Sequence, residues 1–241
     1  METELNAALA GDLVQLIRLH DRELDPATVD ALKAVNFPQG LALQPGGEGG
    51  ALGLNNMAAA VAELETSQLD LLAADFAAIY LNNRYSTSPC ESVWLSDEHL
   101  ACERPMFELR EIYAAAGLQL ANRRQRFDDH LVLQLHYLAH VLLRPTVDGT
   151  QLAKFIDEHL GYWFPEFAQR VSLLCATPFY AALAELTHCW LISFRQLLAD
   201  FYDQPVVDRE LIAQRIQRKL ALDKAEIAPI RFMPGVQGPS W

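Results

Sequence analysis

An acidic and a basic side chain stand next to each other in the middle of the chain, at Asp129 and His130. A histidine beside a carboxylate is a common starting point for general acid–base catalysis. A carboxylate near a helix start is also stabilised by the helix dipole, by about 0.3 to 1 kcal/mol, without any catalytic role. No local motif supplies a serine or cysteine nucleophile. The pair alone therefore does not predict an enzyme.

Two histidine spacings are compatible with metal ligands. His136 and His140 are one helical turn apart, as ligands on a helix often are, but Tyr137 stands where a zinc protease has its glutamate. Glu185 and His188 form one Glu-x-x-His motif, whereas a di-iron bundle needs two such motifs and two further glutamates. We expect no metal site and no cofactor bound by this chain.

The acid and the base lead into an apolar segment, residues 126–143, that predicts a helix with Asp128 as its N-cap. Only Gln134, His136 and His140 interrupt its leucines, valines and tyrosine. An exposed face would leave several leucines in water, at about 1.5 to 3 kcal/mol each. We therefore expect this helix to lie at the centre of the fold, surrounded by other helices.

Helical spacing, caps and stop signals predict the other elements. Helices are expected over about 3–20, 26–36, 57–64, 67–81, 105–116, 150–160, 163–175, 177–202 and 208–222. Residues 37–56 include five glycines within eight residues and are expected to form a flexible connection. Residues 82–103 form a turn-rich loop whose aromatic side chains suggest a packed, functional segment. No strand pattern is present, so the predicted fold class is all-α.

Composition narrows the function classes. The formal net charge of −12 over 241 residues argues against a nucleic-acid partner. No apolar run approaches the roughly 20 residues of a membrane span. No secretory signal is evident and the four cysteines have no metal-binding spacing, so we expect free thiols in the cytoplasm.

Six features follow one another along the chain: Asp75–Tyr80, Ser88–Trp94, Tyr113 with Gly117–Leu118, Asp129–His130, Phe155 with His159–Leu160 and Trp163, and Pro178–Tyr180. Together they resemble the TorD/DmsD family of cytoplasmic chaperones that mature molybdoenzymes. The resemblance covers residues 65–203 and implies a single-domain multi-helix bundle around the buried central helix. Asp128 stands where the family usually has proline, and Gln134 and His136 stand in place of two acidic residues.

The helical pattern and the resemblance together predict a domain organisation. Residues 1–205 would form the chaperone domain, in which 1–56 is a helical hairpin with the Gly-rich connection and 57–205 is the best-matching part. Residues 206–241 would form a C-terminal helix and an irregular Pro/Gly tail. A separate hypothesis is that the tail from Pro229 to Trp241 docks in the client groove or on a neighbouring subunit.

The implied function is binding without catalysis. The family's clients are apo-molybdoenzymes, reductases or dehydrogenases, held until their cofactor is inserted and proofread before twin-arginine (Tat) export. Their signal peptides carry a basic region followed by an apolar, potentially helical region, which requires an apolar groove with carboxylates at one end. We expect one cleft formed by the apolar residues Tyr85, Pro89, Trp94, Leu95 and Phe127, the acidic residues Glu91, Asp97, Asp128 and Asp129, and the polar residues Ser92 and His130.

Other interpretations stay open at this point. A helical scaffold or dimerisation module would not co-purify with a molybdoenzyme, and a helical-bundle metal protein would contain metal on analysis. A homodimer, including one that exchanges segments across the Gly-rich connection, is also left open. The sequence identifies neither the particular client nor any guanine nucleotide site.

Overall fold

The computed structural model describes residues 2–95, 99–119 and 126–226. The chain divides into two units, Met1–Val206 and Val207–Trp241. The second unit is described through α11, Arg209–Glu226, where the sequence predicts a helix over 208–222. The hypothesis about the Pro229–Trp241 tail concerns residues outside the described part.

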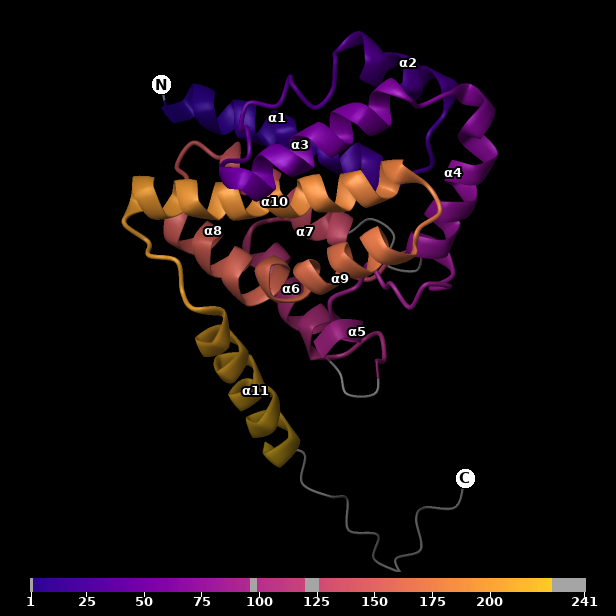
Figure 1. Ribbon diagram of the computed structural model, residues 1–241. Helices are drawn as coiled ribbons and strands as arrows, with labels where there is room; N and C mark the ends of the chain where they lie inside the picture. The colour runs from indigo at the N-terminus through magenta and orange to yellow at the C-terminus, as the bar shows by residue number, and fades with distance from the viewer. Residues whose placement is uncertain (1, 96–98, 120–125, 227–241) are drawn as a thin grey trace, which may run out of the picture. The chain divides into compact units, whose positions relative to one another are not determined.

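The first unit is built from helices, shown in Figure 1. Within the described residues no β-sheet forms, so the all-α prediction is confirmed. None of the described helices combines the length and hydropathy needed to cross a membrane. The elements are α1 Glu2–Asp21, α2 Pro26–Ala34, α3 Gly47–Ala62, η1 Thr66–Gln68, α4 Leu69–Phe76, η2 Ala77–Leu81, α5 Ser92–Leu95, α6 Arg104–Ala115, α7 Leu131–Leu142, α8 Gly149–Phe155, η3 Ile156–Leu160, α9 Gly161–Leu174 and α10 Pro178–Tyr202.

Helix α7 is the predicted central helix, and it is buried on most of its surface. Leu131, Leu135 and Leu138 are fully inaccessible to solvent, and α1 packs along the helix. The expected N-cap is wrong, because α7 begins at Leu131 and its cap is His130. The His130 side chain accepts a hydrogen bond from the backbone N–H of Val132, at 3.1 Å.

The Gly-rich segment is the main error of the sequence prediction. Residues from Gly47 onward are not a flexible connection but the first turns of α3. A Cβ at Gly53 would lie 3.5 Å from the sulfur of Cys189 and 3.7 Å from Leu186 on α10. These are ordinary contact distances, so α3 lies directly against α10 at this position, and the packing between the two helices outweighs the low helix propensity of glycine.

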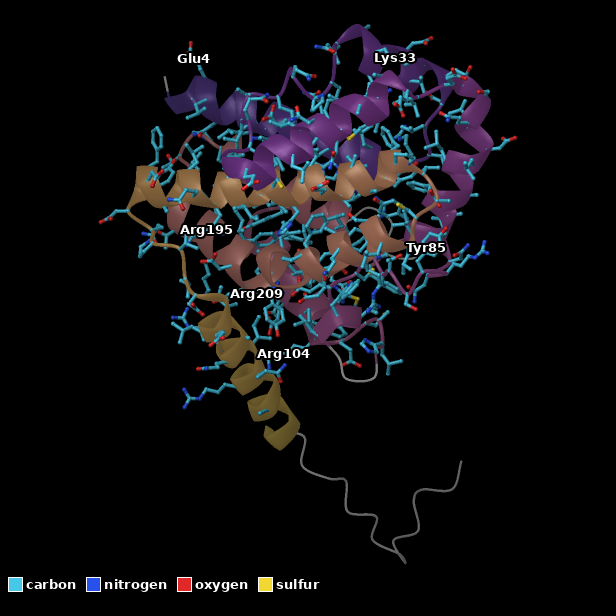
Figure 2. The ribbon with its side chains drawn as sticks, viewed as in Figure 1. Glu4, Lys33, Tyr85, Arg104, Arg195 and Arg209 are labelled. Atoms are coloured by element: carbon cyan, nitrogen blue, oxygen red, sulfur yellow. The ribbon has the colours of Figure 1, made fainter. Side chains whose placement is uncertain are left out.

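Helix α10 runs between α3 and α9 across the unit (Figure 1). Its expected start at Pro178, with Thr177 as cap, is confirmed, as is its end at Tyr202. Near that end the buried guanidinium of Arg195, labelled in Figure 2, forms two hydrogen bonds with Asp157, at 2.8 and 2.9 Å. It also donates to the backbone carbonyls of Gln204 and Pro205, each at 2.8 Å.

Two π-helical turns interrupt helices that the sequence predicts as regular. One, η2, follows α4 and includes Tyr80; the other, η3, joins α8 to α9 and includes His159. Such turns insert one extra residue per turn and often occur at functional sites. Both residues take part in the polar contacts of the candidate site.

Candidate functional site

The loop before α5 and the segment entering α7 are held together by backbone hydrogen bonds. Glu91 N donates to the carbonyl of Asp129 at 3.1 Å, and Leu131 N donates to the carbonyl of Pro89 at 2.7 Å. The Asp129 carboxylate accepts a further bond from Ser92 N, at 2.8 Å. Two of the regions singled out from the sequence are therefore adjacent in the structure.

A buried polar network lies beneath this junction. The Glu91 carboxylate is within 2.9 Å of His159 Nδ1 and accepts a 3.0 Å bond from the Gln134 amide. Burial raises the pKa of Glu91, although His159 acts in the opposite direction. Burial alone would lower the pKa of His159, but the charge and the hydrogen bond of Glu91 outweigh burial and raise the pKa of His159. This network fixes the loop to α7 and η3.

A cleft of about 440 Å³ opens beside the same junction. Its walls come from the end of α1, from α4 and η2, from the loop around Pro89, and from the segment before α7. The described residues lining it are His20, Asp21, Phe76, Tyr80, Leu81, Asn83, Ser88, Pro89, Cys90, Val93, His99, Ala101, Arg126, Phe127 and His130. A volume of this size fits a small ligand or several apolar side chains of a peptide.

The floor of the cleft carries uncharged histidines. His20 lies 2.6 Å from the Tyr80 hydroxyl and 2.9 Å from that of Thr187. Burial lowers the pKa of His20 to about 3 and lowers that of His130 to about 3 as well. Both imidazoles are therefore neutral near pH 7.

An ion pair lies among the lining residues. Arg126 Nη1 donates to Oδ1 of Asp21, and the two side chains are 30% and 24% exposed. Burial alone would raise the pKa of Asp21, but Arg126 and Arg22 together lower it. Within the described lining, Asp21 is the carboxylate and Arg126 is the guanidinium.

The structure places the predicted site residues in two groups. Pro89, Phe127 and His130 line the cleft, and Phe127 is 41% exposed. The described lining of this cleft includes neither Trp94 nor Tyr85, and the expectation that all of these residues bind the client in one cleft stays a prediction. Leu95 is half-buried, is the last residue of α5 and does not line the cleft either, while Asp97 lies outside the described residues.

The two aromatic residues outside the cleft have defined partners. Trp94 stacks on Trp163 with ring centroids 6.4 Å apart and donates its indole N–H to the carbonyl of Ser88, at 2.8 Å. Arg170 lies over the Trp94 ring, 5.3 Å from its centroid. Tyr85, labelled in Figure 2, donates its hydroxyl to the carboxylate of Asp75 at 3.0 Å.

The predicted acidic rim also requires correction. Glu91, Asp128 and Asp129 are all at most 3% exposed, so they do not form a surface for a basic peptide. Asp128 accepts two hydrogen bonds from Arg110, at 3.1 and 2.8 Å. Burial raises the pKa of Asp129, although the N–H of Ser92 opposes this. These carboxylates and Ser92 are buried in this conformation, and a part in client binding stays a prediction for them.

The sequence prediction missed His20, Asp21 and Arg126. Arg126 directly precedes Phe127, a predicted site residue, so its position in the sequence could have indicated that it lines the same cleft. Asp21 ends α1 and is 105 positions away from Arg126, and no local motif connects the two. Only the packing of α1 along α7 brings them together.

The candidate metal residues do not form a metal centre. In the described part of the chain, no three or more His, Cys, Asp or Glu side chains are arranged to hold a metal ion. His136 is exposed on α7, and Glu185 accepts a 2.8 Å bond from the Asn56 amide. The four cysteines are free thiols.

Comparison with known proteins places this chain in a family. The model of the nitrate reductase delta subunit family matches residues 46–169, just over half of the chain. The chain belongs to this family. The resemblance to TorD proteins inferred from the sequence is confirmed by curated relatives that carry that name.

Three curated relatives of this chain are named Chaperone protein TorD. One from Vibrio cholerae serotype O1 is 30% identical over 150 residues, or 58% of this chain and 67% of the relative. A second, from another strain of that serotype, is 33% identical over 51% of this chain and 59% of the relative. One from Shewanella pealeana is 30% identical over 57% of this chain and 65% of the relative. The chain thus spans about two thirds or less of these relatives.

The family match covers only part of the residues that line the cleft. The walls from Phe76 to Ala101 and from Arg126 to His130 lie within the matched residues 46–169, whereas His20 and Asp21 precede them. The nitrate reductase delta subunit family model therefore describes most of the cleft but not the contribution of α1.

Proposed function

We propose that this protein is a cytoplasmic chaperone for the maturation of a molybdoenzyme. It binds the apo form of a reductase or dehydrogenase subunit together with its twin-arginine signal peptide, until the cofactor is inserted and Tat export follows. It acts by binding and carries out no catalytic step. The observation that carries the proposal is that the family match, shared with relatives named as TorD chaperones, includes most of the walls of the cleft.

The chemistry of the cleft suits such a client. Aromatic and aliphatic side chains, with uncharged imidazoles, provide a surface for the apolar part of a signal peptide. The formal net charge of −12 attracts a basic segment over a distance. Because exposed charges are screened beyond about 8 to 10 Å at physiological ionic strength, affinity for the signal peptide should fall as salt is added.

Co-purification tests the proposal. The tagged chain is produced with the catalytic subunit of a molybdoenzyme, either with or without the twin-arginine signal peptide of that subunit. We expect the apo subunit to be retained, and retention to fall when the signal peptide is removed. Val93→Asp, which places a charge in the cleft, should also weaken retention.

Val14→Asp is the matched control, because Val14 is 53% exposed on α1 and does not line the cleft. Retention that is equal with and without the signal peptide would contradict recognition of that peptide. Retention that is equal for the two aspartate variants would remove the cleft from the proposed site.

A further inference from the structure

The Asp21–Arg126 ion pair in the cleft is more exposed to solvent than the other acidic groups nearby. Glu91, Asp128 and Asp129 are buried and held by His159, Arg110 and Ser92, respectively. The Asp21 carboxylate is 24% exposed, and its partner Arg126 is 30% exposed. Asp21 is thus the carboxylate of the described lining that an entering molecule can reach.

The second oxygen of Asp21 is already approached from outside. Arg22, whose side chain is 70% exposed, reaches Oδ2 of Asp21 with a long contact of 3.5 Å. Arg126 occupies only Oδ1. The carboxylate therefore accepts guanidinium groups from two directions, and the bond to Oδ2 is weak enough for a competitor to replace it.

Apart from Arg22, the pair is surrounded in the cleft by aromatic, aliphatic and uncharged polar side chains, among them two neutral histidines. His20 and His130 are neutral, and the imidazole of His130 is committed to capping α7 through Nδ1. Phe76 and Tyr80 form part of the floor, and the exposed ring of Phe127 follows Arg126 directly. Aromatic side chains thus lie next to one carboxylate, whose close partner is Arg126 and whose weaker partner is Arg22.

We propose that Asp21 binds an arginine of the client segment, and that Arg126 occupies this position while the cleft is empty. The inference rests on the proposed function and names the residue that recognises the basic part of the client. Replacing one guanidinium with another keeps the hydrogen bond to Asp21 and the charge around it. An uncharged segment would leave the internal pair in place, and an acidic one would have to pair with Arg126 instead.

This arrangement makes Arg126 a competitor of the client. Removing it should strengthen binding, although it removes a side chain from the cleft wall. Exposed ion pairs alter equilibria by only a few tenths to about one kcal/mol, which corresponds to about 1.5- to 5-fold. We therefore expect Arg126→Gln to raise affinity for an arginine-containing peptide by about two- to fivefold, and Asp21→Asn to lower it by a similar factor.

The experiment is a fluorescence anisotropy titration of the full chain with synthetic peptides at low salt. One probe contains two adjacent arginines followed by a Leu/Ala run, and matched probes carry glutamine or glutamate at the two arginine positions. Arg126→Gln should strengthen binding of the arginine probe and leave the glutamine probe unchanged. The double variant Asp21→Asn/Arg126→Gln should bind like Asp21→Asn alone, because Arg126 then has nothing to block.

Lys33→Gln is the matched control, since Lys33 on α2, labelled in Figure 2, carries the same charge and does not line the cleft. Equal gains for Arg126→Gln and Lys33→Gln would overturn the inference, because they reflect net charge alone. If the wild type binds the arginine probe and neither Arg126→Gln nor Asp21→Asn changes the affinity, the inference is overturned while the proposed function stands. Preference for the glutamate probe would assign recognition to Arg126, and absence of binding by every variant would count against both proposals.

Discussion

Asp12, Asp75 and Asp129 are buried carboxylates that accept hydrogen bonds from backbone N–H groups of loops. Asp12 accepts from Ala42 and Leu43, both at 2.8 Å, and Asp75 accepts from the two residues before α10. The sequence gives no sign of these roles, since each aspartate is separated from its backbone N–H partners by 30 or more positions. Asp129 was predicted as a binding residue because the sequence does not show that its carboxylate accepts a bond from Ser92 N, 37 positions away.

Asp129→Ala is expected to lower the free energy of unfolding by about 1 to 3 kcal/mol, because the buried N–H of Ser92 loses its acceptor. Asp129→Asn retains an acceptor oxygen and should cost less. Chemical denaturation of both variants measures the difference. A fully stable alanine variant would show that the carboxylate is not needed to hold the two segments together.

His20 should make stability depend on pH. The pKa of His20 in the folded chain is about 3, below its ordinary value of 6.5, so the unfolded chain binds the proton first. Stability is therefore lost as the pH falls from about 6.5 towards 3, at up to about 1.4 kcal/mol per pH unit for this residue. In denaturation series over this range, His20→Gln should show a shallower decline than wild type. Parallel curves would contradict the assignment.

At the scale of elements, local signals predicted helix ends well where one residue fixes the backbone. Asp25 caps α2 by accepting from Thr28 N, and Gly117 adopts a positive φ of 76° after α6, as expected for a helix stop. The start of α3 was missed, because glycine content indicates flexibility locally, whereas contact with α10 decides the outcome. The π-helical turns have no local signature of this kind.

A second close approach involves Gly149 at the start of α8. A Cβ there would lie 2.2 Å from Cγ of Tyr202, near the root of that side chain. Gly149→Ala should therefore displace the end of α10 and cost about 1 to 3 kcal/mol. Gly11→Ala is the matched control, because the added methyl group on α1 meets nothing within 4 Å and should stabilise by up to about 1 kcal/mol. Thermal unfolding that shifts both variants in the same direction would contradict this account.

For the whole molecule, the lack of a strand pattern predicted the fold class and the apolar pattern of residues 126–143 predicted the central helix, and the family resemblance agreed with both. The cleft was only partly predictable. Pro89, Phe127 and His130 belong to the recognisable segments, but His20 and Asp21 enter from α1. Such a site depends on the packing of remote helices, and no spacing within one segment encodes that packing.

The hydrogen bonds from Arg195 to the carbonyls of Gln204 and Pro205 indicate where the polypeptide can be shortened. A stop codon after Val206 leaves both carbonyls in place, so cooperative melting of the first unit should persist. A stop codon after Tyr202 removes them and leaves a buried guanidinium with only Asp157, at a cost of about 1 to 3 kcal/mol. Calorimetry of the two shortened proteins would measure this difference, and equal melting temperatures would show that the two carbonyls are dispensable.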